Sequence, residues 1–255
     1  MRNLTRLVSI FVLLIVSNSA LGASKKPLAL IYKDSGSCFA CEVGARAAAE
    51  DAGMKTRYIS ADEITPSLLK KAQLWIQPGG NAIDVAKRMD PKAYGYLKDY
   101  IEQGGNYLGY CAGAFFADYF VDNDNTIPGL GIIPGGVTKD YLPGDTGAHI
   151  LPVRWHRNDK TFVRHLFFGE GPVFVFETPG TVEIIGEYVD NEASAPPIAV
   201  VQFKHGKGNV VLTAIHPEVP AWARWYYGLE DPDGSDRDLA VELVNRALFG
   251  KPSQQ

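Results

Sequence analysis

The stretch Asn106–Phe120, NYLGYCAGAFFADYF, combines an apolar strand-like run, a turn of small residues and a single cysteine. Cys111 stands between Gly109 and Gly113 in the pattern G-x-C-x-G. Where a strand passes directly into a helix, this pattern is typical of a nucleophile elbow. Large neighbours would clash in so sharp a turn, so the two glycines let the chain aim the cysteine above the carboxyl edge of the sheet.

The expected helix after Cys111 would direct its N-terminus at the thiol and favour the thiolate. The backbone N–H of Ala112 would be placed to stabilise an oxyanion. By itself, the pattern is equally compatible with a buried structural cysteine in a glycine-rich turn. A catalytic role therefore requires a base elsewhere in the chain.

The segment GNVVLTAIHPEV supplies a candidate base, because it reads as a strand that ends at His216-Pro217-Glu218. A cysteine nucleophile needs a base, and the base needs an acceptor that orients it. Side chains two residues apart on a strand point to the same side, so Glu218 would hold the imidazole while His216 faces the thiol. Alternatively, His216 is a core or surface histidine and Glu218 a solvated carboxylate or helix cap. Their joint occurrence with an elbow favours a Cys–His–Glu triad.

Pro78-Gly79-Gly80 follows another expected strand, 73–77, which should neighbour the strand that ends at Cys111. The backbone N–H of Gly79 or Gly80 would then supply a second oxyanion donor, and Gly79 is also a candidate for the substrate pocket. The alternative is a plain turn, since this tripeptide interrupts many loops.

Strands and helices alternate through the first half of the chain, which predicts an α/β fold with a doubly wound, mainly parallel sheet covered on both faces. The second half is richer in strands, and a helix closes the chain. One domain spanning 26–249 accounts for this order. The expected strands are 27–33, 55–60, 73–77, 106–110, 149–155, 172–176, 182–189, 198–206 and 209–215; the expected helices are 42–53, 91–103 and 236–249.

The first 22 residues predict a secretory signal peptide: Arg2 and Arg6, an apolar run from Leu7 to Val16, and a small-x-small site at 20–22. A membrane anchor is the alternative, but the run is shorter than the about 20 residues that span a bilayer. The mature protein is expected to be exported, periplasmic or extracellular, with no membrane span. A formal net charge of −4 excludes a generally basic nucleic-acid-binding protein.

Cys38 and Cys41 form a C-x-x-C pair and leave Cys111 as the odd thiol. In an oxidising compartment the close pair is expected to form a disulfide with Cys111 free, because pairing over two intervening residues is local. A redox-active pair is the alternative. With two thiols and no histidine nearby in sequence, no metal site is expected.

Two further segments bear on the pocket. The segment FFGEGPVFVF places Glu170 between two glycines ahead of a strand, where it either contacts substrate or only turns the chain. The aromatic segment PAWARWYYG, 220–228, is expected to pack in the core; a platform that stacks on a ligand, or a wall of the pocket, is the alternative.

The motifs IQPGG, YLGYCAGAFF and TAIHPE, in this order and spacing, resemble a class I glutamine amidotransferase-like domain. GGNYLGYCAGAFFA and GKGNVVLTAIHPE are similar, more closely, to the domain at the N-terminus of fungal biotin-protein ligases and in stand-alone bacterial proteins. The resemblance covers about 26–249 and implies a flavodoxin-like fold. It also implies Cys111 as nucleophile, His216 as base, Glu218 as orienting carboxylate, and the N–H groups of Gly80 and Ala112 at the oxyanion.

One departure from this family pattern concerns the substrate. Glutamine-hydrolysing members usually carry a glycine and a glutamine shortly after the nucleophile, whereas this chain has Ala114, Phe115 and Phe116. No synthase or biotin-ligase catalytic domain is expected. The sequence therefore favours a thiol-dependent hydrolase or amidase that acts without a cofactor on a small-molecule or peptide substrate. A non-catalytic binding module is the alternative; substrate identity and oligomeric state are left open.

Overall fold

The computed structural model describes residues 26–178, 180–190 and 193–251. The expected signal peptide, 1–22, lies outside these residues. The strands are β1 (Leu28–Tyr32), β2 (Lys55–Ile59), β3 (Leu74–Gln77), β4 (Asn106–Tyr110), β5 (Gly136–Asp140), β6 (Ala148–Arg157), β7 (Lys160–Gly169), β8 (Pro172–Phe176), β9 (Glu183–Tyr188), β10 (Ile198–His205) and β11 (Gly208–Thr213). The helices are α1 (Phe39–Asp51), the 3-10 helix η1 (Ala61–Glu63), α2 (Pro66–Leu69), α3 (Ala82–Arg88), α4 (Pro91–Glu102), α5 (Ala112–Phe116), α6 (Ala221–Tyr226) and α7 (Arg237–Phe249).

All the described strands belong to one sheet, whose main order is β2-β1-β3-β4-β11-β10-β9-β6-β7. The pairs from β2 through β11 are parallel, whereas β10, β9, β6 and β7 continue the sheet in antiparallel pairing, and β8 joins β10 to β5. The expected α/β class is confirmed. The expectation of a mainly parallel sheet is only partly confirmed, because hairpins connect the second half of the chain where helical crossovers connect the first.

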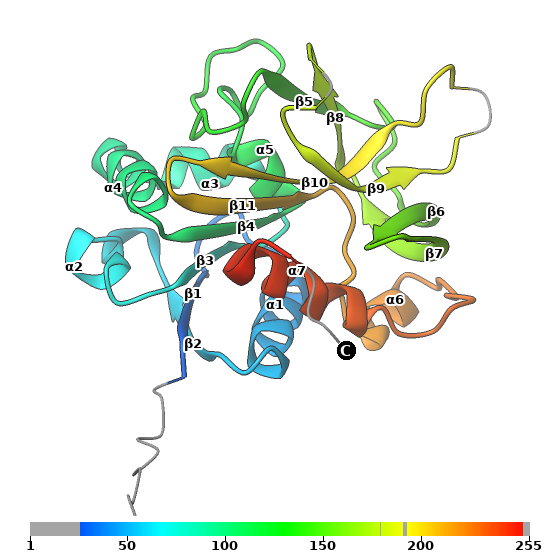
Figure 1. Cartoon of the computed structure of the whole chain (residues 1–255), viewed down its shortest axis with the longest axis horizontal. Coiled ribbons are helices and arrows are strands. Elements are labelled where there is room, and N and C mark those ends of the chain that lie inside the picture. Colours follow the sequence, from blue (N-terminus) through cyan, green and yellow to red (C-terminus); the bar gives the residue numbers. More distant parts are fainter. Residues whose placement is uncertain (1–25, 179, 191–192, 252–255) are drawn as a thin grey trace, which may run out of the picture.

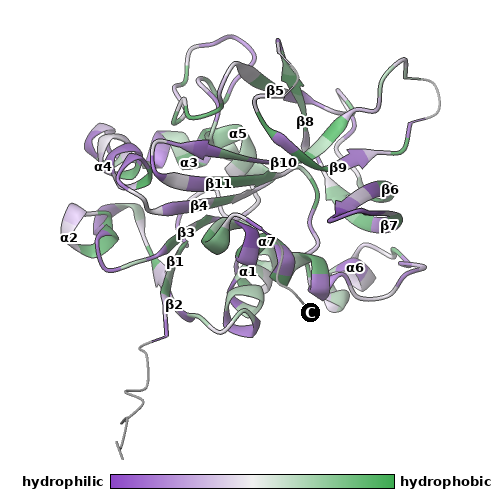
Figure 2. Cartoon of the chain, in the orientation of Figure 1, coloured by the Kyte–Doolittle hydropathy of each residue, from purple (hydrophilic) through white to green (hydrophobic). Residues whose placement is uncertain are grey.

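Helices cover both faces of the parallel half, with α1 and α7 packed together on one face and α3, α4 and α5 on the other (Figure 1). The strands β1, β3 and β4 are almost entirely buried, as expected for parallel strands between two helical layers. Figure 2 shows hydrophobic residues along β1 and β3 and hydrophilic ones on α4, consistent with a core between sheet and helices. Among the described residues, no helix combines the length and the hydrophobicity needed to cross a membrane.

Helix α1 begins at Phe39 rather than at residue 42, because Cys38 acts as its N-cap and its Sγ accepts the Cys41 N–H at 3.2 Å. Strands β5 and β7 were not predicted. In β7, the charged and polar positions of KTFVRHLFFG obscure the apolar alternation.

The aromatic segment 220–228 was also expected in the core, and this prediction is wrong. Trp222, Trp225 and Tyr226 on α6 are 50%, 80% and 77% exposed. The buried face of α6 is instead used by Arg224, which pairs with the buried carboxylates of Asp231 and Asp236. A guanidinium with two carboxylate partners is satisfied inside the protein, and the aromatic rings are left on the outer side.

The elbow between β4 and α5 is as tight as its glycines predict. A Cβ on Gly109 would lie 2.6 Å from the carbonyl oxygen of Gly113, and a Cβ on Gly113 would overlap the carbonyl oxygen of Gln77 on β3. Real Cβ atoms do not approach a carbonyl so closely, so neither position accepts a side chain without moving the backbone. The elbow thus depends on close contact with the neighbouring strand.

This contact predicts a large difference between two glycine substitutions. Gly113→Ala should lower the free energy of unfolding by about 1–3 kcal/mol through overpacking. Gly95→Ala is the matched control, because Gly95 lies on exposed α4 with open space at its Cβ position. This control should raise stability by about 0.5–1 kcal/mol. Urea unfolding followed by tryptophan fluorescence measures both, and equal effects at the two positions would contradict the tight-elbow interpretation.

Candidate active site

Cys111 lies at the centre of the parallel half, where β4, flanked by β3 and β11, passes into α5. Its backbone is at φ 44° and ψ −99°, a conformation that non-glycine residues rarely adopt. The Cys111 N–H donates to the carbonyl oxygen of Thr213 at 2.7 Å, which continues the β4–β11 ladder into the turn. The strained backbone directs the side chain to the carboxyl edge of the sheet, as a nucleophile elbow does.

The thiol is buried beneath the connection between β7 and β8. Cys111 is 3% exposed, and its Sγ lies 3.5 Å from the carbonyl oxygen of Gly169 and 3.9 Å from that of Glu170. Glu170 itself has a positive φ of 56°. This connection is therefore a close cover over the thiol, and its backbone oxygens occupy the space in front of the sulfur.

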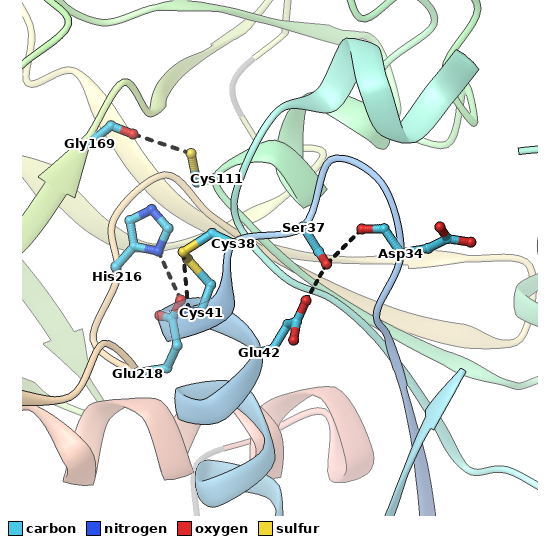
Figure 3. The surroundings of a disulfide bond; sticks show 9 residues. All are labelled: Asp34, Ser37, Cys38, Cys41, Glu42, Cys111, Gly169, His216 and Glu218. Atoms are coloured by element: carbon cyan, nitrogen blue, oxygen red, sulfur yellow. Dashed lines mark hydrogen bonds and ion pairs between the residues drawn. A yellow bond between two sulfur atoms is a disulfide. The ribbon is translucent and has the colours of Figure 1, made fainter. Parts of the chain in front are cut away.

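His216 and Glu218 form a buried pair beside the elbow. The His216 Nδ1 and the Glu218 Oε1 are 2.8 Å apart, and the residues are 4% and 2% exposed. In Figure 3 the other ring nitrogen of His216 points toward Cys111. Strand alternation was expected to bring the two side chains together. Strand β11 instead ends at Thr213, and His216 and Glu218 meet through the turn that follows it.

Opposing influences act on the His216 imidazole. Burial disfavours its charged form, but the Glu218 carboxylate and the hydrogen bonds with Cys111 and Glu218 outweigh burial and raise the pKa of His216 to about 10. At neutral pH the ring is then an imidazolium that donates its Nδ1–H to Glu218. A positive ring beside Cys111 stabilises negative charge on the sulfur.

The two expected oxyanion donors, the N–H groups of Gly80 and Ala112, have no acceptor among the residues that the structure describes. Ala112 opens α5, where the first N–H groups of a helix have no partner within the helix. Gly80 follows β3, the strand next to the elbow strand, and lines a cavity. Both donors therefore remain available to a bound group.

Gly79 lies behind the imidazole and does not line that cavity. A Cβ on Gly79 would overlap Cε1 of His216 and lie 3.1 Å from Sγ of Cys41. The absence of a side chain here is what allows the His216 ring to sit against the turn after β3. Gly79 is therefore needed for the observed position of the His216 ring rather than for the wall of the cavity.

A cavity of about 490 Å³ opens next to the elbow, between the turn after β3, helix α5 and the β7–β8 connection. Glu170 and Gly80 both belong to its wall. Among its described lining residues, no lysine or arginine is present, whereas five are acidic: Asp122, Asp124, Asp140, Asp145 and Glu170. The cavity wall is therefore acidic, with no basic side chain among these lining residues to balance it.

The Cys38 and Cys41 sulfur atoms are bonded, with their Cα atoms 5.2 Å apart, and Cys111 carries a free thiol. One side-chain atom from each of Cys41, His216 and Glu218 lies within 4.8 Å of the others. While Cys41 is bonded to Cys38, it offers no thiolate to a metal ion. The disulfide thus lies in the immediate surroundings of the histidine.

Two neighbours of the site were not identified from sequence. The backbone carbonyl oxygen of Phe167 accepts the backbone N–H of His216 at 2.8 Å. The Phe167 ring packs edge-on against the imidazole, with ring centroids 5.8 Å apart. Tyr188 is close enough to Cys111 for the sulfur's charge to help raise the tyrosine pKa, although burial is the larger cause. Phe167 lies on β7 and Tyr188 on β9, and no local sequence motif identifies either residue. Phe167 could have been placed near the site only if strand β7 had been predicted.

Comparison with known proteins agrees with the expected resemblance. Residues 58–226 match the family described as "Biotin-protein ligase, N terminal". A biotin–protein ligase of Schizosaccharomyces pombe is 33% identical over 192 residues, which are 69% of this chain and 29% of the ligase. The chain therefore spans less than a third of that relative.

Two solved structures share the fold. A glutamine amidotransferase superposes with a TM-score of 0.58 at 18% identity, over 78% of this chain and 96% of that one. A β-galactosidase from Bacillus circulans sp. alkalophilus superposes with a TM-score of 0.52 at 17% identity, over 89% of this chain and 32% of the enzyme. The expected glutamine amidotransferase-like fold is thus confirmed, and at these identities the likeness concerns the fold alone.

The raised pKa of His216 predicts how the free energy of unfolding changes with pH. Because the folded-state pKa of about 10 exceeds the value of about 6.5 of an unfolded histidine, the stabilisation is fully present below pH 6.5 and is lost as the pH rises toward 10. The free energy of unfolding should therefore decline more between pH 7 and 10 in the wild type than in His216→Gln, by an amount on the order of a few kcal/mol.

The same pair can be titrated directly. In ¹⁵N-histidine NMR spectra, Glu218→Gln should lower the pKa of His216, because the variant loses the carboxylate charge but keeps a hydrogen-bond acceptor. An unchanged histidine pKa in this variant would show that Glu218 does not stabilise the imidazolium.

Proposed function

The chain belongs to the family of the biotin-protein ligase N-terminal domain, and on that premise we propose that it is a thiol-dependent hydrolase of the amidase type. Cys111 is the nucleophile, His216 the base and acid, and Glu218 the carboxylate that orients the imidazole. The ligase relative is more than three times as long as the matched region, so its ligase activity is not carried over. The proposal rests on the site of this chain.

The observation that supports this proposal best is that a strained cysteine backbone and a buried His–Glu pair lie together at one edge of the sheet. The backbone at Cys111 is strained, and the His216–Glu218 pair is buried with one ring nitrogen directed toward the sulfur. Backbone strain persists only where the surroundings enforce it, and buried charges cost free energy unless paired. A protein that used this cysteine only for packing would need neither feature.

In the proposed reaction the Cys111 thiolate attacks an acyl or amide carbonyl and a C–S bond forms. The N–H groups of Gly80 and Ala112 stabilise the oxyanion. The C–N or C–O bond of the substrate breaks, and the His216 imidazolium donates its proton to the leaving group. Neutral His216 then takes a proton from water, whose oxygen attacks the thioester and releases the acid and the thiol.

The cavity beside the elbow favours particular substrates. Its acidic wall attracts a cationic group and repels a carboxylate, so an amide or peptide with an amino or guanidino group fits it best. Ala114, Phe115 and Phe116 follow the nucleophile where glutamine-hydrolysing relatives carry a glycine and a glutamine, which argues against free glutamine as the substrate. No cofactor takes part in the proposed chemistry. We place the protein outside the cytoplasm, on the basis of its first 22 residues.

The second candidate is a non-catalytic binding module built on the same fold. It is favoured by the backbone oxygens of Gly169 and Glu170, which occupy the space in front of the thiol. Such a module would use the adjacent cavity for ligand binding and leave Cys111 unreactive. Thiol reactivity therefore separates the two functions.

With the Cys38–Cys41 disulfide intact, iodoacetamide should alkylate Cys111 rapidly near pH 7, as followed by mass spectrometry of the Cys111 peptide. His216→Ala should slow alkylation by about tenfold or more, because the imidazolium that stabilises the thiolate is lost. His205→Ala is the matched control, since His205 lies in the β10–β11 hairpin at the opposite end of β11 from His216. A slow wild-type reaction, or no difference between the variants, would favour the binding module.

The charge of the cavity predicts a preference among covalent probes. A chloroacetamide with an ammonium group should react with Cys111 about fivefold faster, or more, than a carboxylate-bearing probe of equal length at low salt. Asp140→Asn in the cavity wall should reduce this ratio, whereas Asp159→Asn in the exposed β6–β7 turn should not. The proposal of a cationic substrate fails if the anionic probe reacts equally fast.

A further inference from the structure

The Cys38–Cys41 pair has the placement of an exchangeable disulfide. It lies at the N-terminus of α1, a helix of 13 residues, with Cys38 as N-cap. Cys38 is partly exposed, whereas Cys41 is buried at 4% exposure. Cys38 is therefore the more accessible residue of the pair, and the one at which an external thiolate would attack. The Cys41 N–H already donates to the Cys38 Sγ at 3.2 Å, and the first turn of a helix stabilises negative charge at this position.

The buried sulfur faces the candidate active site. Cys41 Sγ, a ring nitrogen of His216 and a carboxylate oxygen of Glu218 lie within 4.8 Å of one another. Figure 3 shows the disulfide between the His216–Glu218 pair and Ser37. The second carboxylate oxygen, Glu218 Oε2, is buried without a hydrogen-bond partner. A charge that develops on Cys41 would therefore act on both the imidazole and the carboxylate of this pair.

A purely structural role explains this placement poorly. The bond joins residues three apart in sequence, so it removes little conformational freedom from the unfolded chain. The α1 segment around it is already anchored, because Cys38 N–H donates to the carbonyl oxygen of Gly79 at 2.9 Å and Ser37 Oγ donates to Glu42 at 2.5 Å. The local structure therefore has support that does not depend on the S–S bond.

We propose that Cys38–Cys41 is an exchange-active disulfide and that its reduction by an external dithiol switches the active site by releasing a thiolate from Cys41 next to His216. Phe39, next to Cys38 in sequence, and Trp222 are exposed, with ring centroids 6.2 Å apart. The exchange step needs only the geometry of the pair. The switching step rests on the proposed function, in which His216 activates Cys111.

The exchange uses one dithiol. Its thiolate attacks Cys38 Sγ, a mixed disulfide forms, the Cys38–Cys41 bond breaks, and Cys41 leaves as a thiolate. The second thiol of the reductant loses its proton to solvent and attacks the mixed disulfide, which releases Cys38 and the oxidised, cyclic dithiol. Two electrons pass from the dithiol to the protein disulfide. A reverse exchange with an oxidised dithiol restores the bond.

The consequence for the active site is a competition for one imidazolium. In the oxidised protein Cys41 is neutral, and the positive ring of His216 is available to Cys111. In the reduced protein the Cys41 thiolate lies beside the same ring and shares its charge and its proton. The Cys111 thiolate then loses part of its stabilisation, so the oxidised form is the reactive one.

The test uses the full chain with EDTA present, so that reduced Cys41 cannot act through a captured metal ion. Protein is equilibrated with defined ratios of reduced and oxidised dithiothreitol, freed of reagent under anaerobic conditions, and treated with iodoacetamide. Mass spectrometry of the separate cysteine peptides reports the redox state of the pair and the alkylation rate of Cys111. Reduction should leave circular dichroism unchanged and slow alkylation of Cys111 by about tenfold.

Two matched variants locate the effect. Cys38→Ser leaves Cys41 as a permanent thiol beside His216 and should show the slow rate of the reduced protein. Cys41→Ser leaves the thiol at the exposed position, and its Cys111 rate should not respond to reduction. Equal Cys111 rates in these two variants, and in both redox states of the wild type, would overturn the switch.

Thiol–disulfide exchange at Cys38–Cys41 can be tested without a reactive Cys111. In a Cys111→Ser background the pair should equilibrate with dithiothreitol while the protein stays folded; reduction that occurs only together with unfolding would overturn the exchange step. If Cys111 is unreactive in the oxidised wild type, the proposed hydrolase function and the switch both fail, while this background still tests exchange.

Discussion

Cys111 is held at φ 44°, a backbone conformation that costs a non-glycine residue about 1–3 kcal/mol and must be enforced by its surroundings. The enforcement comes from both neighbouring strands. The Thr213 carbonyl oxygen on β11 accepts the Cys111 N–H, and Gln77 on β3 lies against Gly113 so closely that no side chain fits between them. The position of the thiol, the start of α5 and the open edge of the sheet all follow from this turn.

The two halves of the sheet contribute different parts of the site. The parallel half provides the elbow and the glycine turn after β3, because parallel strands bring their carboxyl ends to one edge. The antiparallel half provides the cover: Gly169 and Glu170 lie over the sulfur, and Phe167 fixes the backbone of His216. Strand β11 belongs to both halves, since it pairs with β4 on one side and β10 on the other, and the histidine follows it.

Burial makes the electrostatics of the site interdependent. The imidazolium of His216 is removed from water and is stabilised by the Glu218 carboxylate and the Cys111 sulfur, so the loss of either partner weakens it. Cys41 lies within the same few ångströms but contributes no charge while it is bonded to Cys38. In the proposed switch, breaking the S–S bond would add a second anionic sulfur beside the imidazole.

Sequence alone determined the features encoded by local chemistry. The glycines around Cys111 indicated the elbow, the strand–helix alternation indicated the α/β class, and the spacing of His216 and Glu218 indicated that their side chains meet. These inferences succeeded because tight turns and buried strands impose residue types at fixed spacings.

Tertiary structure decided what depends on contacts between distant segments. No local pattern shows that β7 and β8 cover the thiol, that Gly79 makes room for the imidazole, or that Cys41 lies beside His216, since these residues are far apart in the chain. The exposed face of α6 was likewise set by the buried partners of Arg224 and not by the aromatic residues around it. Local sequence selects turns and strands, whereas packing of the two sheet halves decides which side chains share a site.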